Sequence, residues 1–80
     1  MDWRHVPSLA ALRAFEAAAR LTSYSAAARE LNVTHAAVAQ HVRKLEDHFG
    51  LSLMRRDGQT MQPTVDGQRL SRSLSTAFGQ

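Results

Sequence analysis

The sequence lacks cysteine altogether, so this chain of 80 residues forms no disulfide bond. The same absence excludes a cysteine-based zinc site and catalysis by a thiolate, because both need the sulfur atom. No stretch comes near the roughly eighteen consecutive apolar residues of a membrane-spanning helix, and the start MDWRHVP lacks the charged-then-apolar order of a signal peptide. We therefore expect a soluble, cytoplasmic protein with no membrane partner.

The composition that remains is that of one small folded domain. Apolar residues make up 44% of the chain and charged residues 21%, a balance that argues against disorder. The net charge of +3 permits nucleic acid as a partner without requiring it. Residues 1–50 hold six basic and five acidic side chains, a net of +1, whereas residues 51–80 hold four and two, a net of +2.

Four segments have the apolar spacing and the end signals of α-helices. We expect them over residues 9–20, 24–31, 35–49 and from 65 to near the end of the chain, with Ser8, Ser23, Thr34 and Thr64 as N-caps. Asn32 and Gly50 are expected to end the second and third helices, because both residue types tolerate the left-handed backbone conformation found there.

Between the third and fourth helices the pattern changes to that of a β-hairpin. Residues 51–54, LSLM, alternate apolar and polar side chains as a half-buried strand does. Asp57-Gly58 is a strong turn signal, and residues 61–62 supply the returning strand before Pro63 breaks it. The sequence therefore predicts a hairpin over residues 54–61.

Residues 24–43 fit the spacing of a helix-turn-helix motif. Ala28 lies where the two helices would touch, Leu31 and Val33 are expected to fill the core on either side of the turn, and Val38 and Val42 anchor the second helix. The first turns of that helix then project small and hydrogen-bonding side chains, as a helix that enters a major groove does.

A plain helical hairpin whose polar face meets only water is the alternative. The hairpin that follows, with Arg55 and Arg56 near its tip, favours a winged helix, because arginine is suited to contacts with phosphate. A protein-interaction module with the same fold is the rival function, and an enzyme is a more distant one. His41 and His48 are about 10.5 Å apart along one helix, too far to share a metal ion.

Two segments carry a resemblance to a known family, LRAFEAAARLTSYSAAARELNVTHAAVAQHVRKLEDHFGLSLMRR and PTVDG. They resemble the N-terminal DNA-binding domain of LysR-type transcriptional regulators, particularly the regulators of glycine cleavage and of β-lactamase induction. The resemblance implies a mainly α fold, with a winged helix-turn-helix domain over residues 1–63 and a linker and dimerisation helix over residues 64–80. It further implies a bacterial regulator that is not an enzyme. A small-molecule effector would bind a sensing domain beyond residue 80, so we expect no cofactor and no metal here.

The motif and the resemblance together predict contacts with double-stranded DNA. The expected base contacts are His35, Ala36, Ala39 and Gln40. The expected backbone contacts are Ser23, Ser25, Thr34, Arg43, Arg55, Arg56 and Gln59. The resemblance also marks two departures, since His35 and Ala39 stand where the family usually has glutamine and serine. The resemblance therefore does not fix the base preference of this chain.

The last helix carries an apolar stripe of the kind that pairs helices. Its residues Leu70, Leu74, Ala77 and Phe78 recur at spacings of three and four. We expect this stripe to join a homodimer that reads a pseudo-palindromic operator, with higher oligomers in the full-length protein. The alternative is that the stripe covers the first helix of its own chain.

Overall fold

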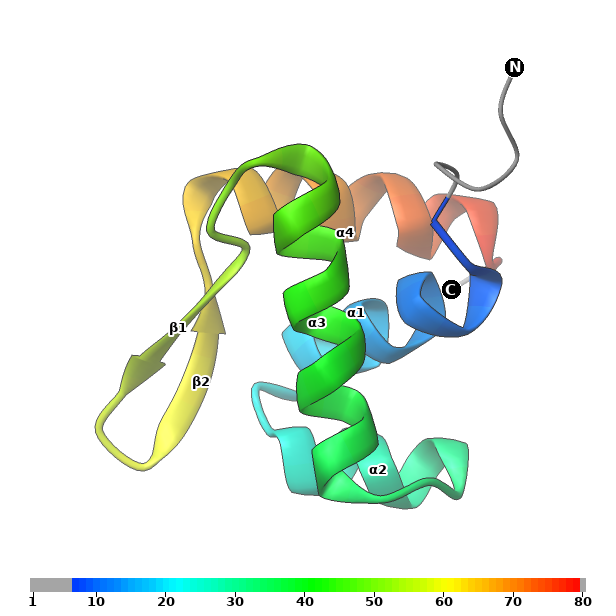
Figure 1. The fold of residues 1–80 in the computed structure, drawn as a ribbon, viewed down its shortest axis with the longest axis vertical. Helices are drawn as coiled ribbons and strands as arrows, with labels where there is room; N and C mark the ends of the chain where they lie inside the picture. The colour runs from blue at the N-terminus through cyan, green and yellow to red at the C-terminus, as the bar shows by residue number, and fades with distance from the viewer. Residues whose placement is uncertain (1–6, 80) are drawn as a thin grey trace.

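Four helices and one β-hairpin build residues 7–79, the part of the chain that the computed structural model describes (Figure 1). In chain order the elements are α1 (Leu9–Leu21), α2 (Tyr24–Leu31), α3 (His35–Phe49), β1 (Met54–Asp57), β2 (Thr60–Pro63) and α4 (Val65–Ala77). The expected winged helix-turn-helix architecture is confirmed, with α1 one residue longer than expected. The N-terminal and C-terminal ends of the two expected domains, residues 1–6 and 80, lie outside the described residues.

Every helix begins at a hydroxyl side chain, as the sequence predicts. The hydroxyl oxygens of Ser8, Ser23, Thr34 and Thr64 each accept a hydrogen bond, at 3.0 Å, from the backbone N–H three residues later. Asn32 and Gly50 end α2 and α3 in the left-handed conformation, with φ of 58° and 67°. Because these capping and terminating residues act on their near neighbours in the chain, tertiary packing leaves their effect unchanged.

The end of α1 was not foreseen. Thr22 follows the helix with a φ of 51°, a left-handed conformation that is strained for a β-branched residue. Its carbonyl oxygen accepts a hydrogen bond from the Met61 N–H, at 3.2 Å. The strained corner between α1 and α2 is thereby tied to β2.

The core lies where α1 crosses α3. Phe15 and Val38 are fully buried there, together with Val42, Leu45 and Leu53. Buried alanines on α1 and α2 let the helices approach closely, because a methyl group is the whole side chain. One expected core residue is exposed: Val33 has 43% of its surface accessible. Its backbone N–H closes the turn on the Ala28 carbonyl, at 3.0 Å, and its side chain borders a surface hollow beside Leu31 instead.

The strand expected over residues 51–54 is wrong except for Met54. Residues 52 and 53 belong to no strand, and Glu46 and Thr64 bond to their backbone groups. The Leu53 N–H donates to the Glu46 carboxylate at 2.8 Å, and its carbonyl accepts from the Thr64 N–H at 3.0 Å. The Ser52 carbonyl accepts from the Thr64 hydroxyl at 2.6 Å. With these groups occupied, strand pairing begins only at Met54.

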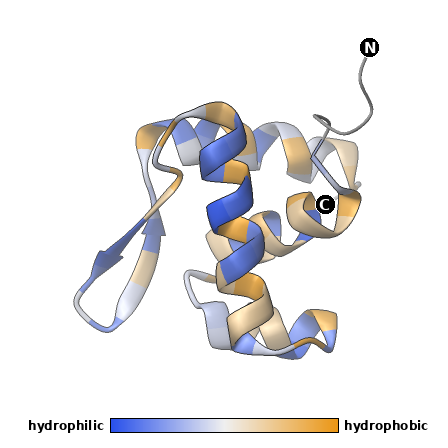
Figure 2. Ribbon diagram, viewed as in Figure 1, coloured by the Kyte–Doolittle hydropathy of each residue, from blue (hydrophilic) through white to orange (hydrophobic). Residues whose placement is uncertain are grey.

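The hairpin itself is antiparallel, and its register pairs Met54 with Pro63, Arg56 with Met61 and Asp57 with Thr60. Gly58 and Gln59 form the two-residue turn. Only Gly58 has a positive φ, 62°, which is the pattern of a type II′ turn. Figure 1 shows the hairpin standing away from the helices on one side of α3, and Figure 2 shows β1 hydrophilic toward the tip of the hairpin.

Helix α4 lies against α1, on the same core. Gly67 allows the close approach, because a Cβ atom there would lie 2.0 Å from the Leu53 carbonyl oxygen. Leu70 and Leu74 then pack against the core as half-buried side chains. Residues on both sides of the expected boundary at residue 63 therefore share one core. None of the helices formed by residues 7–79 is long and apolar enough to cross a membrane.

Candidate nucleic-acid interface

The outward side of α3 gathers the residues that the sequence assigns to base contacts. Val38, Val42 and Leu45 hold the helix by its other side, each at most 1% exposed. The residues left outward in the first turns are exposed, except Ala39, which is half-buried; they are His35, Ala36, Ala39, Gln40 and Arg43. The two alanines let another backbone approach the helix closely. Their contacts with DNA remain predictions.

Three hydroxyl groups expected to meet phosphate lie at helix starts. Ser23 and Thr34 use a hydroxyl oxygen to cap α2 and α3, and each cap leaves the O–H hydrogen for another acceptor. Ser25 is exposed in the first turn of α2. The structure thus allows these residues to donate to phosphate, and it also explains Ser23 and Thr34 without DNA.

The two arginines of the hairpin face opposite sides of it. Arg56 lies on the same face as Met54 and Met61, because residues two apart and cross-strand partners share a face. Both methionines pack against the core, so this face is turned toward the helices. Arg55 lies on the other face, with Asp57 3.8 Å away; both side chains are more than half exposed, so that ion pair is weak. Gln59 is exposed in the turn.

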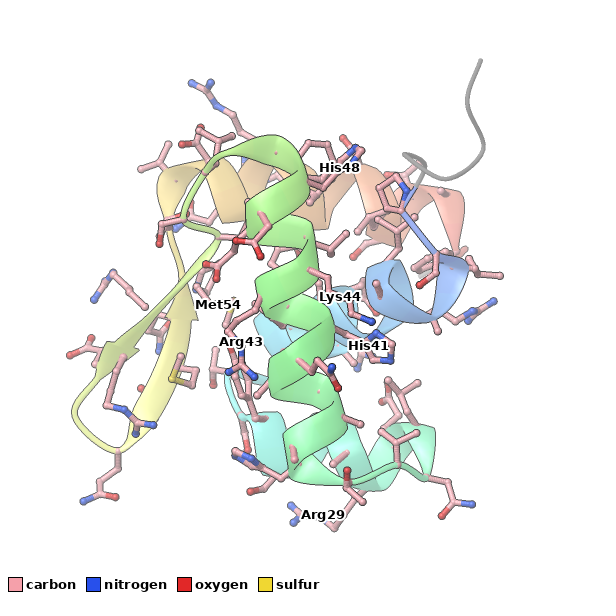
Figure 3. All side chains as sticks on the ribbon, viewed as in Figure 1. Arg29, His41, Arg43, Lys44, His48 and Met54 are labelled. Carbon is pink, nitrogen blue, oxygen red and sulfur yellow. The ribbon has the colours of Figure 1, made fainter. Side chains whose placement is uncertain are left out.

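Arg43 points from α3 toward the side on which the hairpin lies (Figure 3). Arg56 lies on the hairpin face that is turned toward the helices, so the two arginines come from different elements to one surface between α3 and the hairpin. Arginine binds phosphate through several donors held in one plane, and it keeps its charge at all relevant pH values. This surface is thus suited to an anionic backbone.

Glu46 holds the base of the hairpin, a role that the sequence did not indicate. It is half-buried, and its carboxylate accepts hydrogen bonds from the N–H groups of Leu53 and Met54, at 2.8 and 3.3 Å. These donors come from a segment seven and eight residues away, which no helical spacing reveals. Glu46 thus fixes the hairpin relative to α3.

Tyr24 is a second residue that the sequence did not single out. It begins α2 and packs against the core as a half-buried side chain. Its ring centroid is 5.7 Å from that of His35, at the start of α3. Burial raises the pKa of Tyr24; Glu46 raises this pKa further, while Arg43 and Arg56 lower it. The positive charges of Arg43 and Arg56 therefore both act on the phenol.

The apolar stripe of α4 is used within the chain. Leu70 and Leu74 pack against the core, and the Phe78 ring lies under the Arg13 guanidinium, 4.7 Å from its centroid. The alternative that the stripe covers α1 is therefore correct as far as these three residues go. Leu70, Leu74 and Phe78 are half-buried rather than fully buried, and Ala77 is exposed. The dimer seam remains a prediction.

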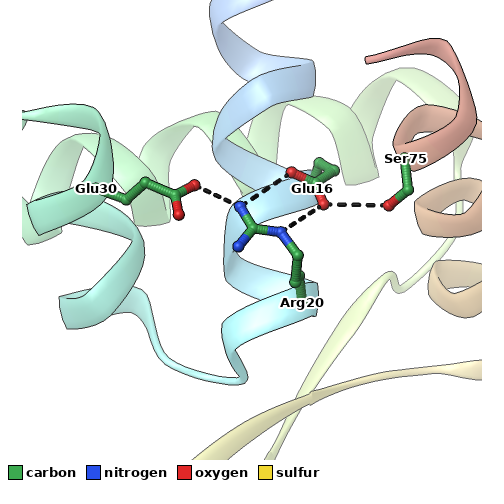
Figure 4. Close-up of polar contacts among 4 residues, drawn as sticks. All are labelled: Glu16, Arg20, Glu30 and Ser75. Carbon is green, nitrogen blue, oxygen red and sulfur yellow. Dashed lines mark hydrogen bonds and ion pairs between the residues drawn. The ribbon is translucent and has the colours of Figure 1, made fainter. Parts of the chain in front are cut away.

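A buried ionic cluster joins three helices, and no sequence pattern pointed to it (Figure 4). Glu16 in α1 is only 2% exposed, and its carboxylate accepts from the Arg20 Nε at 2.9 Å and from the Ser75 hydroxyl of α4 at 3.2 Å. Arg20 also pairs with Glu30 of α2. These two carboxylates raise the pKa of Arg20. The cluster thus locks α1, α2 and α4 together.

The described residues form no group of three histidine or acidic side chains that could hold a metal ion. Of the four histidines, His35 stands beside Tyr24 and His48 packs edge-on against Phe49, with ring centroids 4.8 Å apart.

Comparison with known proteins agrees with this geometry. Residues 9–68 match the family described as "Bacterial regulatory helix-turn-helix protein, lysR family". The chain is 50% identical over 78 residues to the AhcY transcriptional activator HvrB of Rhodobacter capsulatus, covering 98% of this chain and 27% of the relative. It is 43% identical over 77 residues to the glycine cleavage system transcriptional activator of Escherichia coli, covering 96% and 25%. The chain thus spans about a quarter of the length of these curated relatives.

Solved structures show the same fold. Oxidized OxyR of Corynebacterium glutamicum superposes with a TM-score of 0.85 at 26% identity, over 92% of this chain and 24% of that one. The BenM DNA-binding domain in its complex with catB site 1 DNA superposes with a TM-score of 0.79 at 23% identity, over 99% and 81%.

Proposed function

Because the chain belongs to the lysR family of bacterial regulatory helix-turn-helix proteins, we propose that it binds double-stranded DNA at specific sites and thereby regulates bacterial transcription. In this proposal α3 enters the major groove and the β1–β2 hairpin lies on the backbone or in the minor groove. One observation carries the proposal. The exposed side of α3 places small and hydrogen-bonding residues next to Arg43 and to the hairpin face that carries Arg56.

The proposed roles divide by side-chain chemistry. His35 and Gln40 offer an imidazole and an amide to base edges, and Ala36 and Ala39 allow the close approach. The residues proposed to contact phosphates or sugars are Ser23, Ser25, Thr34, Arg43, Arg55, Arg56 and Gln59. Because the proposed partner is bacterial DNA, we propose that the regulation takes place in the bacterial cytoplasm.

Selection of bound sites from a random DNA pool tests the proposal, and two substitutions locate the readout. His35→Ala and Gln40→Ala should each lower the preference for the selected site over a scrambled one by about 1–3 kcal/mol, because a well-placed base contact contributes on that order. His48→Ala, which removes an imidazole from the other end of the same helix, is the matched control and should leave the preference unchanged. The measurement is a pair of equilibrium titrations at one salt concentration.

Two results would count against this assignment. If no sequence is enriched and sheared DNA is not retained even at low salt, the chain uses its fold as a protein-interaction module. If sites are selected but both variants keep the full preference, α3 does not read bases through these residues.

We also propose that the full-length protein carries an effector-binding domain and dimerises through α4. The relatives are about four times as long as this chain, which leaves room for such a domain. On α4, Ala77 is exposed and Leu70, Leu74 and Phe78 are only half covered by α1, so the edge of the stripe offers apolar surface to a second copy. Two α3 helices would then read half-sites about one helical turn apart, or a multiple of that.

Ala77→Glu tests the dimer without disturbing the contacts between α4 and α1. A carboxylate at the seam should lower affinity for a duplex with two half-sites while affinity for a single half-site changes little. Gln68→Glu adds the same charge at an exposed position of α4 outside the stripe, so any difference between the variants belongs to the seam. Sedimentation of both on the two-half-site duplex reports stoichiometry. An unchanged two-to-one complex with Ala77→Glu would place the interface elsewhere.

A further inference from the structure

Tyr24 lies where three elements of the DNA-binding surface meet. It is the first residue of α2, and its ring is held between the core and the His35 ring at the start of α3. Its phenol also lies within the electrostatic reach of Arg43, from α3, and of Arg56, from the hairpin.

The register of the hairpin explains why Arg56, rather than Arg55, acts on Tyr24. Arg56 shares its face with Met54 and Met61, and that face is turned toward the helices. Arg55 points to the opposite face. Tyr24 and the two arginines therefore share the surface between α3 and the hairpin, which offers an anion two charged donors and one neutral donor. The Glu46 carboxylate also acts on Tyr24, but it accepts hydrogen bonds from the N–H groups of Leu53 and Met54.

Two properties suit the phenol to this place. Its ring is held by the core and by His35, so little rotational freedom is lost when the hydroxyl makes a bond. Burial is the main cause that raises the pKa of Tyr24, so the hydroxyl keeps its proton and remains a donor at neutral and mildly alkaline pH.

We infer that the Tyr24 hydroxyl donates a hydrogen bond to a DNA backbone phosphate at the surface between α3 and the hairpin, near Arg43 and Arg56. The inference rests on the proposed function, since it needs duplex DNA on that surface. It assigns to Tyr24 a contact with the backbone and not with a base, because the hydroxyl belongs to α2 and lies near the two arginines.

The neutral charge of the phenol gives this contact a distinctive salt response. Each charged side chain that neutralises a phosphate releases counterions and adds about −0.9 to the slope of log affinity against log salt. A neutral hydroxyl adds hydrogen-bond energy and releases no counterion. Loss of the Tyr24 hydroxyl should therefore lower affinity without changing the slope, whereas loss of Arg56 should lower affinity and flatten it.

Tyr24→Phe is the first test, measured with a short duplex of mixed sequence and with the selected site, each over a series of salt concentrations. The ring and its packing are retained. Affinity should fall about tenfold for both duplexes with an unchanged slope, because a hydrogen bond to a charged acceptor contributes on that order. Arg56→Ala should flatten the slope by about 0.9. Arg55→Ala is the comparison, because it removes the same charge from the opposite face of the hairpin. Ser73→Ala, which removes an exposed hydroxyl from α4, should change nothing.

Tyr24 is the single tyrosine of the chain, so a second test needs no loss of the hydroxyl. Replacing tyrosine by 3-fluorotyrosine during expression yields one fluorine resonance, whose titration follows the phenol. Addition of the mixed-sequence duplex should move that titration to higher pH, because a donor to an anion resists deprotonation.

The outcomes distinguish a failure of the proposed DNA binding from a failure of the Tyr24 phosphate contact. If the wild-type chain binds neither duplex, the proposed function fails. If it binds and Tyr24→Phe binds equally well, or the fluorotyrosine titration ignores DNA, the phosphate contact is wrong. A loss confined to the selected site would also overturn it, since Tyr24 would then act by positioning His35 for base readout.

Discussion

Replacing Gly67 by alanine is expected to lower the free energy of unfolding by about 1–3 kcal/mol, the usual cost of forcing extra atoms into a closed contact. The added Cβ would lie 2.0 Å from the carbonyl oxygen of Leu53 and 3.0 Å from its carbonyl carbon. Backbone atoms cannot swing aside as a flexible side chain can. Alanine also favours a helix by up to about 1 kcal/mol over glycine, and this smaller gain is outweighed.

Leu53 cannot yield easily, because its backbone is held on both sides. Its carbonyl accepts from the Thr64 N–H at 3.0 Å, and its N–H donates to the Glu46 carboxylate at 2.8 Å. The strain must therefore move α4, which would lift Leu70 and Leu74 from the core. Urea unfolding followed by circular dichroism measures the loss, and Gln68→Ala, at the exposed neighbouring position, is the control. An unchanged midpoint for Gly67→Ala would mean that α4 does not approach Leu53 so closely in solution.

Replacing Arg20 by methionine is expected to be the more damaging change, with a loss of about 2–3 kcal/mol. Removal of one partner from a buried ion pair leaves the other charge uncompensated, and Glu16 is only 2% exposed. The Ser75 hydroxyl, at 3.2 Å, would remain as a neutral donor. We place the loss below the usual range of about 3–5 kcal/mol because the Arg20 side chain is 33% exposed and so partly screened.

A double substitution distinguishes the buried charge from lost packing. Adding Glu16→Gln to Arg20→Met removes the unpaired charge and should recover part of the stability, which a loss of packing alone would not allow. Glu30→Gln removes only the exposed partner of Arg20 and should cost less than about 1 kcal/mol. Equal losses in the single and the double variant would show that the charge of Glu16 is not what destabilises the protein.

The sequence predicted the structural features that depend on neighbouring residues. It missed the contacts between residues that are far apart in the chain. Caps such as Thr34 and the terminator Asn32 act within a few positions, so their signals could be read directly. Glu16 looked like an ordinary charged residue of an amphipathic helix, because its partner Ser75 lies 59 residues away. The alternation in residues 51–54 was misleading for the same reason, since Thr64 and Glu46 take the backbone groups that a strand would use.

The candidate DNA surface divides in the same way. The outward placement of His35 and Gln40 follows from helical period once Val38 and Val42 are taken as the inner side. The difference between Arg55 and Arg56 does not follow, because it depends on the hairpin register, and a shift of one residue would exchange their faces. Tyr24 could have been found only by asking which aromatic residue precedes the turn and faces the third helix.

The hydrogen bond from Met61 to Thr22, together with the grip of Glu46 on the base of the hairpin, bears on how this surface can change over evolutionary time. Both attachments lie at or below the Arg56–Met61 pair, and none involves Gly58 or Gln59 at the tip. Insertions in the turn would lengthen the hairpin while its attachments to the helices stay in place. In the proposed complex, the length of DNA backbone that the hairpin contacts can therefore change separately from the bases that α3 would read. Related sequences with one base preference could then differ in how much duplex they contact.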